Sequence, residues 1–235
     1  MGVKFLIIAK QFNRLKKQIG ILLFNVLVFV SAFSQKPQFS LATDISLFRS
    51  FKKDQRYWSV GQTVAGHFNF TPADGFYVWF AYSSNGKFNK QLEAMAKSAI
   101  TIPQQVSYTN YAKLRFNHIS MGWKHYLKGV YNTEDQWNLY GYAGFGLLFG
   151  IVENTHSVPV DSTDYDIPVW QGKTKFKRLT IDLGIGYEIP LGGDIYFYLE
   201  GRALVPTTDY PSHYLFINEN APLIGSVNAG VRLLF

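Results

Sequence analysis

A histidine and a serine stand two positions apart in the segment RFNHISMGWKHYL, as His118 and Ser120. In a β-strand, residues i and i+2 point to the same face, so a strand would place both side chains on one face. An imidazole beside a hydroxyl can take its proton and turn the oxygen into a nucleophile. The pair is therefore a candidate for nucleophilic catalysis.

Such catalysis also needs a third group that orients the histidine. The His-x-Ser pair is similar to that of the lipid A deacylase family, and this resemblance implies His118 as the base, Ser120 as the nucleophile and a glutamate downstream. The chain departs from that pattern, because Met121 follows the serine, Asn132 stands where the glutamate falls, and the nearest acid, Glu134, belongs to an expected turn. We therefore expect no enzymatic activity. His118 and Ser120 would then be two polar residues in the lumen of the barrel that the strand pattern below predicts, with lipid A hydrolysis as an alternative function.

Metal and cofactor chemistry finds no support in the residue spacing. The five histidines show no HExxH or similar metal spacing, and a chain without cysteine has no thiolate ligands. The GFG at 144–146 and the GIG at 184–186 lie inside expected strands and open no helix, so neither is a dinucleotide loop. The acids within residues 152–175 match no EF-hand spacing and indicate a solvated loop. We expect neither a metal nor a cofactor.

Alternation of apolar and polar residues with period two dominates the chain after residue 37, and no apolar run there is long enough for a spanning helix. In the clearest segment, Leu179, Ile181 and Leu183 alternate with polar or small residues. About ten residues are enough for a tilted strand to cross a bilayer. Eight such segments are expected, at residues 38–48, 58–70, 76–84, 111–127, 138–151, 176–189, 195–205 and 223–235.

The connections between these segments alternate in length. Those after the second, fourth and sixth segments are short (71–75, 128–137 and 190–194), and the others are mostly longer (49–57, 85–110, 152–175 and 206–222). This alternation predicts an all-β, eight-stranded antiparallel up-and-down transmembrane β-barrel with both termini at the short-turn end. Within the second long connection, the helical spacing of apolar residues over 91–100 predicts a short helix.

The two faces of the strands decide between a water-soluble barrel and one in lipid. Bulky apolar residues occupy one face of every strand, and they would overfill the narrow interior of an eight-stranded barrel. We therefore expect them outside. In 111–127, Leu114 and Phe116 differ in parity from Ile119, so a β-bulge near Asn117 is expected if both stretches face lipid. Aromatic girdles are predicted from Tyr57, Trp58, Phe76, Tyr77, Trp123, Tyr126, Trp137 and Tyr140.

The opposite face carries ionisable residues, which we place in the lumen. An unpaired buried charge costs several kcal/mol, so these side chains are expected to pair with one another. We predict an ion-pair network that plugs the lumen, with a narrow porin-like channel as an alternative. The predicted members are Asp44, Arg178, Asp182, Glu188, Glu200, Arg202 and Arg232.

The formal net charge of +7 does not indicate a nucleic-acid-binding protein. Residues 1–34 hold five lysines and arginines and no acid, which leaves 18 basic and 16 acidic residues in the remainder. This basic stretch continues into an apolar run and then into small residues before Gln35, as a secretory signal peptide does. We expect residues 1–34 to be a cleaved signal peptide and residues 35–235 to be the barrel domain.

The last strand ends in an aromatic residue. Val231, Leu233 and Phe235 share one face, and this ending resembles the signal that the barrel-assembly machinery reads in outer-membrane barrels. With the leader and the eight strands, the chain resembles the small porin-like outer-membrane β-barrels of the Bacteroidota and, more distantly, the transmembrane domain of outer-membrane protein A. The resemblance implies the outer membrane of a Gram-negative cell.

From this resemblance we expect a structural or interaction role through extracellular loops. The expected partners are outer-membrane lipids and lipopolysaccharide, the barrel-assembly machinery during insertion, and a protein or surface at the loops. The connection 206–222 contains Tyr210, Tyr214, Leu215 and Phe216, an apolar set suited to such contacts.

Overall fold

The computed structural model describes residues 38–53, 55–207 and 223–235; the expected leader and the Tyr210–Phe216 patch lie outside them. Within this part of the chain, no helix is long and apolar enough to cross a membrane. Eight long strands and the two-residue strand β6 (Tyr165–Asp166) make up the fold. The long strands are β1 (Gln38–Ser50), β2 (Trp58–Asn69), β3 (Asp74–Ala96), β4 (Gln105–Lys128), β5 (Asn138–His156), β7 (Gly172–Gly192), β8 (Ile195–Pro206) and β9 (Ile224–Leu234).

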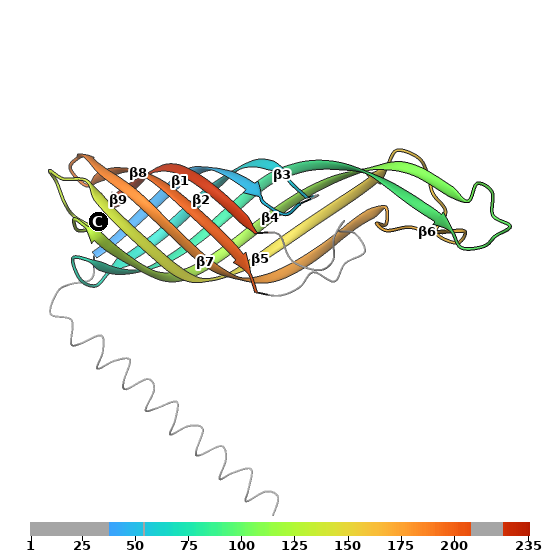
Figure 1. The fold of residues 1–235 in the computed structure, drawn as a ribbon. Coiled ribbons are helices and arrows are strands. Elements are labelled where there is room, and N and C mark those ends of the chain that lie inside the picture. The colour runs from blue at the N-terminus through green and yellow to red at the C-terminus, as the bar shows by residue number, and fades with distance from the viewer. Residues whose placement is uncertain (1–37, 54, 208–222) are drawn as a thin grey trace, which may run out of the picture. The chain divides into compact units, whose positions relative to one another are not determined.

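The eight long strands close into one antiparallel ring (Figure 1). Each strand pairs with its neighbour in sequence, and β1 also pairs with β9, where Ala42 faces Arg232. Pairing of β2 with β3 completes the circuit. The all-β, eight-stranded antiparallel barrel that the alternation predicts is therefore confirmed, and its closure leaves no open edge around the ring.

The short turns gather at one end of the ring. They are residues 70–73, 129–137 and 193–194, close to the predicted positions. Gly129, Gly192 and Gly193 have positive φ angles there, a conformation that other residues rarely adopt. The start of β1 and the end of β9 meet at the same end, where the N–H of Phe235 donates to the carbonyl of Phe39 at 2.8 Å.

Four strands continue past the other end of the ring (Figure 1). Pairing of β2 with β3 stops at Ser83 and pairing of β8 with β7 stops at Thr180, whereas β3, β4, β5 and β7 go on pairing with one another. We call this extension the projecting sheet, and it comprises Gly86–Ala96, Gln105–Leu114, Gly150–His156 and Gly172–Arg178.

The helix predicted over 91–100 is wrong. Residues 91–96 continue β3 and pair with β4, where Leu92 faces Tyr108 and Ala94 faces Val106. Local spacing suited a helix, but pairing with a neighbouring strand satisfies the backbone, buries Ala94 and packs the partly buried Leu92 against apolar partners. The long connection therefore shrinks to residues 97–104.

The bulge predicted near Asn117 is also wrong. Leu114 and Phe116 point inward with His118, and the register shift lies in β3, between Ser83 and Gly86. In this part of β4 the outward residues, Lys113 and Arg115, are charged, and the apolar residues that alternate with them face the interior.

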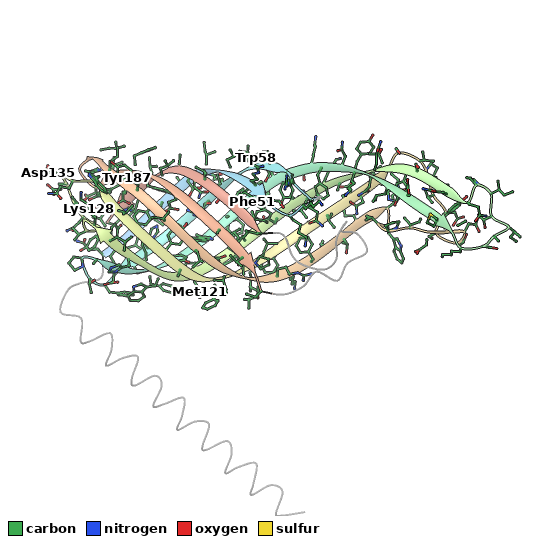
Figure 2. The ribbon with its side chains drawn as sticks, viewed as in Figure 1. Phe51, Trp58, Met121, Lys128, Asp135 and Tyr187 are labelled. Atoms are coloured by element: carbon green, nitrogen blue, oxygen red, sulfur yellow. The ribbon has the colours of Figure 1, made fainter. Side chains whose placement is uncertain are left out.

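Large apolar side chains cover the outside of the ring, as expected. Ile45, for example, is 69% exposed, between the buried Asp44 and Ser46. Met121, at the edge of the barrel in Figure 2, is 53% exposed, and Tyr187 is 41% exposed. The outer surface of the ring is therefore an apolar belt.

Many aromatic residues lie inside, contrary to the girdle prediction. Trp58, Trp123 and Trp137 are on the outside, but Tyr57, Tyr77, Tyr126 and Tyr140 are buried in the interior. Small residues on facing strands make the space: a Cβ on Gly186 would overlap the ring of Tyr140, its register partner. The small lumen residues thus accommodate tyrosine rings rather than leaving the interior open.

Candidate functional site

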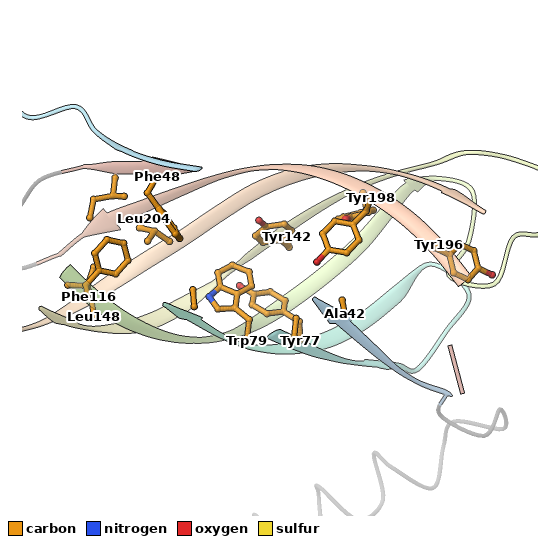
Figure 3. Packing of buried hydrophobic residues seen from close by; sticks show 14 of the residues in the cluster. Ala42, Phe48, Tyr77, Trp79, Phe116, Tyr142, Leu148, Tyr196, Tyr198 and Leu204 are labelled. Atoms are coloured by element: carbon orange, nitrogen blue, oxygen red, sulfur yellow. The ribbon is translucent and has the colours of Figure 1, made fainter. Parts of the chain in front are cut away.

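The lumen is packed in layers along its length (Figure 3). Nearest the projecting sheet the layer is apolar, with Phe48, Phe116, Leu148 and Leu204 in one cluster. The rings of Phe48 and Phe116 meet edge to face, with centroids 5.2 Å apart. Buried aromatic residues and ion pairs line the rest of the lumen, whose width in an eight-stranded barrel suits side chains.

A central ion cluster forms around Arg202 of β8. Its Nη2 lies 3.0 Å from Asp44 Oδ2 and 2.5 Å from Glu200 Oε2, and its Nε donates to Glu200 Oε2 at 2.8 Å. The Nη1 donates to Thr63 Oγ1 at 3.0 Å, and the guanidinium lies 4.5 Å from the centre of the Trp79 ring. The guanidinium therefore has partners at its edges and on one face.

Hydroxyl groups complete this central cluster. Tyr140 donates to Glu200 Oε1 at 2.5 Å, Tyr198 donates to Asp44 Oδ2 at 3.0 Å, and Ser46 donates to Asp44 Oδ1 at 2.6 Å. Two carboxylates face one guanidinium, so the formal charge of this group is negative by one.

A second ion cluster lies near the short turns. Arg232 holds Glu188 through two hydrogen bonds, from Nε at 2.8 Å and from Nη2 at 2.7 Å, and its Nη2 also donates to the carbonyl of Tyr131 at 2.7 Å. Asn138 donates to Glu188 at 3.0 Å, and Lys124 Nζ lies 4.0 Å from the same carboxylate. Two cations share one carboxylate here, which is the opposite of the central cluster.

His118 has its partners on other strands. Trp79 Nε1 donates to His118 Nδ1 at 3.2 Å, so the neutral ring carries its proton on Nε2. That nitrogen lies 2.9 Å from Thr180 Oγ1 and 3.3 Å from Asp182 Oδ2. The structure thus places an acid beside the histidine, and it comes from β7 rather than from the residues that follow β4, where the resemblance would put it.

Ser120 does not join this arrangement. Its hydroxyl donates to the carbonyl of Phe145 at 3.2 Å, and both ring nitrogens of His118 face other groups. Both residues are also buried in the lumen. The structure therefore pairs His118 with Asp182 but does not align His118 with Ser120, and it holds both away from lipid outside the ring.

The remaining predicted residues lie apart from these clusters. Arg178 is half-buried in the projecting sheet, where its Nη1 donates to the carbonyl of Lys177 at 2.6 Å. Val231, Leu233 and Phe235 are on the outer face, and the Phe235 ring stacks on Phe39 with centroids 6.2 Å apart.

No group of three or more histidines and acids within the described ranges is placed to hold a metal ion. These ranges include the acids of the connection between β5 and β7.

The projecting sheet has its own small core. Ala94, Tyr108 and Ile167 are buried together, and Val169 is also fully buried. The connection between β5 and β7 returns over the sheet, with β6 paired to the end of β3 and Lys97 Nζ donating to the carbonyl of Ser162 at 2.6 Å. The sequence analysis placed most of this region in the long connections, with a short helix over 91–100.

Charged residues occupy the outward face of the projecting sheet. Lys87 faces Lys113, which faces Glu153, which in turn faces Lys173, in one row across the four strands. Lys175 and Arg115 lie in the adjacent row. This face is basic and exposed, directly beyond the apolar belt.

The hairpin between β3 and β4 ends in an apolar tip. Ile100 is 88% exposed and Ile102 is 89% exposed. Nearly full exposure of two isoleucines is unusual for a residue type that is normally buried.

No protein-family model matches the chain, and no curated protein matches it in sequence. Similar solved structures include Neisserial surface protein A, at 11% identity over 84% of this chain and 97% of that one, with a TM-score of 0.54. They also include the attachment invasion locus protein Ail of Yersinia pestis in complex with the heparin analogue sucrose octasulfate (10% identity, 86% and 100% covered, TM-score 0.48). The outer membrane protein OprG of Pseudomonas aeruginosa is a third (10%, 86% and 97%, 0.47).

These neighbours are outer-membrane β-barrel proteins. At 11% identity the likeness to Neisserial surface protein A concerns the fold alone, and it supports the eight-stranded antiparallel ring described above.

Proposed function

We propose that the chain is an outer-membrane β-barrel of a Gram-negative bacterium with a structural or interaction role. The observation that carries this proposal is the reversed polarity of the ring, which is apolar outside and charged inside. A water-soluble barrel hides its apolar residues, whereas a barrel in lipid must expose them and pair every backbone group. The apolar belt and the closed strand circuit meet both conditions.

Export and assembly complete this proposal. Residues 1–34 would be removed as a signal peptide, and the barrel-assembly machinery would read Val231, Leu233 and Phe235. Their exposure on the outer face of the last strand supports such reading during insertion. The leader, the eight strands and the terminal aromatic also support a place among the small barrels of the Bacteroidota.

The packed lumen supports a role other than conduction. The lumen ion pairs plug the ring together with the apolar layer, and little room is left for a water path. The projecting sheet then provides the contact surface, with its basic outward face suited to lipopolysaccharide phosphates and its apolar tip suited to a protein or surface.

Single cysteines can test the insertion and its direction, because the natural chain has none. On intact cells, a membrane-impermeant maleimide should label Ile100→Cys at the tip, and it should label Asp135→Cys in the 129–137 turn (Figure 2) only after the outer membrane is opened. A boiled and an unboiled sample should also migrate differently on a denaturing gel. The reverse labelling pattern, or extraction of the protein by carbonate, would overturn the proposal.

A lipid hydrolase is the second candidate, because Asp182 supplies an acid beside His118. The refolded protein and its Ser120→Ala variant should both leave lipid A intact when acyl chains are followed by mass spectrometry, since Ser120 is buried and not aligned with the histidine. Release by the wild type alone would make the protein an enzyme. Steady single-channel currents in a planar bilayer would instead support the narrow channel.

A further inference from the structure

A groove crosses the apolar belt on the side formed by β1, β9, β8 and β7. It has a volume of about 610 Å³, within the range of about 300–1,000 Å³ typical of small-molecule sites. Two rows of paired residues define it. The first runs through Arg49, Gly225, Ala203 and Leu183, and the second through Leu47, Val227, Gly201 and Ile185.

Small residues form the floor of this groove. Gly201, Ala203 and Gly225 occupy outward positions, whereas the same face carries large side chains such as Leu47 and Ile185 on either side. A Cβ built on Gly201 meets no described atom within 4 Å, so the space above it is open. The groove is therefore a hollow in a surface that elsewhere presents large apolar side chains.

The side chain of Arg49 places a positive charge at one end of the groove. The Arg49 guanidinium lies 4.8 Å from the ring centre of Trp58 and 5.6 Å from that of Phe51, and all three residues line the groove. Figure 2 shows Phe51 just after the end of β1 and Trp58 at the start of β2, toward the projecting sheet. The connection that follows adds Lys52, Lys53 and Arg56 to this end.

Among the described residues, the surface at the opposite end of the ring is acidic. Asp74 stands at the start of β3, and Glu134, Asp135 and Asp194 lie in the short turns, beside Lys128. In the proposed orientation, the basic end lies at the outer leaflet. A groove with apolar walls and a cation at the outer headgroup level is complementary to a lipid that has both acyl chains and phosphate.

We propose that this groove holds an acyl chain of a phosphorylated saccharolipid of the lipid A type, with a phosphate at Arg49. The inference rests on the proposed outer-membrane insertion. Lipid tails are as apolar as leucine, so burial from water does not favour the groove over the bilayer. Selectivity comes from close packing against Gly201 and Ala203, beside the Phe51 ring that covers Gly225, and from the charge of Arg49.

Native mass spectrometry can test this site on the refolded barrel in detergent with added lipid A. Gly201→Leu fills the groove where there is open space, and Ala143→Leu is its matched control on the outer face of β5. Arg49→Gln removes the cation, and its matched control Lys128→Gln removes an exposed cation at the opposite end of the ring. We expect retained lipid A to fall about fivefold in Arg49→Gln, because one basic residue near a charged surface contributes about 1 kcal/mol. Retained lipid A should also fall in Gly201→Leu. It should stay unchanged in both controls.

Each other outcome has a defined meaning. Equal retention by all variants would overturn the site, and equal retention of phosphatidylglycerol would overturn its assignment to lipid A. A loss in Gly201→Leu without one in Arg49→Gln would overturn the phosphate contact, and a dimer that Gly201→Leu breaks would assign the groove to a second copy. Heat-modifiable mobility of every sample separates the two proposals: a folded barrel that retains no lipid contradicts only this inference, whereas a sample without that mobility contradicts the insertion itself.

Discussion

The ring and the projecting sheet are built from the same strands, yet their two faces have opposite polarity. Along β7, the outward residues Lys173, Lys175 and Lys177 give way to Leu179 and the aliphatic residues that follow it. On β4 the change is equally abrupt, from outward charges to the outward apolar residues of the belt. The difference teaches that alternation specifies a two-faced strand, while the surroundings at each level decide which face is apolar.

The interiors differ in the matching way. Inside the ring, charged side chains meet in two ion clusters among buried aromatic residues, so the buried face carries charges that the exposed face lacks. Inside the projecting sheet, Ala94, Tyr108, Ile167 and Val169 form an apolar core, as in a water-soluble protein. Lipid surrounds the first region in our proposal, and water surrounds the second.

The largest effect should come from breaking the cluster near the short turns. Glu188→Gln leaves Arg232 and Lys124 buried without their carboxylate, and we expect a loss of about 3–5 kcal/mol in the free energy of unfolding. Urea unfolding in lipid vesicles measures it. The matched control is Glu153→Gln on the exposed face of the projecting sheet, where we expect a change below about 0.5 kcal/mol. Equal effects at both positions would contradict the comparison.

Exchanging an apolar and a charged residue on the outward face of β7 tests where the apolar belt ends and the water-exposed surface begins. Leu183→Lys places an ammonium in the belt and should cost about 2–4 kcal/mol if it lies near the bilayer centre. Lys175→Leu, also outward on β7, should change stability by less than about 0.5 kcal/mol. The same vesicle unfolding assay compares the two. A neutral Leu183→Lys would show that the belt does not contact lipid.

A smaller and more local effect is expected inside the projecting sheet. Val169→Ala removes two methyl groups from a fully buried position, which should destabilise that sheet by about 1.5 kcal/mol. Hydrogen exchange should then speed up in the amides of the projecting sheet while the ring amides stay protected. The control Val158→Ala changes a half-exposed residue on the same connection and should leave both regions as they were. Faster exchange throughout the ring would show that the two regions unfold together.

The smallest effect concerns pH. The backbone N–H and the hydroxyl of Thr163 both donate to Asp161 at 2.8 Å and hold the pKa of that carboxyl below its usual 3.8. Because the folded pKa is the lower one, this stabilisation is present above pH 3.8 and is lost as the pH falls through the folded pKa. Amide exchange of residues 161–165 should therefore accelerate, relative to its intrinsic rate, in acid below pH 3.8. The variant Asp161→Asn should lack this acid-induced step.

Much of the ring follows from the sequence. Period two is a local property, so alternation alone assigned the eight strands and turned Asp44, Glu188, Glu200, Arg202 and Arg232 toward one face. Turn residues with short spacing, such as the stretch around Gly192 and Gly193, marked the end where the strands reverse. These features need no knowledge of which strands are neighbours.

The tertiary structure decided which side chains meet. Arg202 of β8 reaches Asp44 of β1, and Asp182 of β7 lies beside His118 of β4, through registers that strands far apart in sequence set together. The inward tyrosines, the register shift in β3 and the projecting sheet were missed for the same reason. The sequence of each strand alone determines which side chains share a face. The register between strands, the space beside a glycine on a neighbouring strand and the surrounding medium are set only when the strands pair and the ring closes.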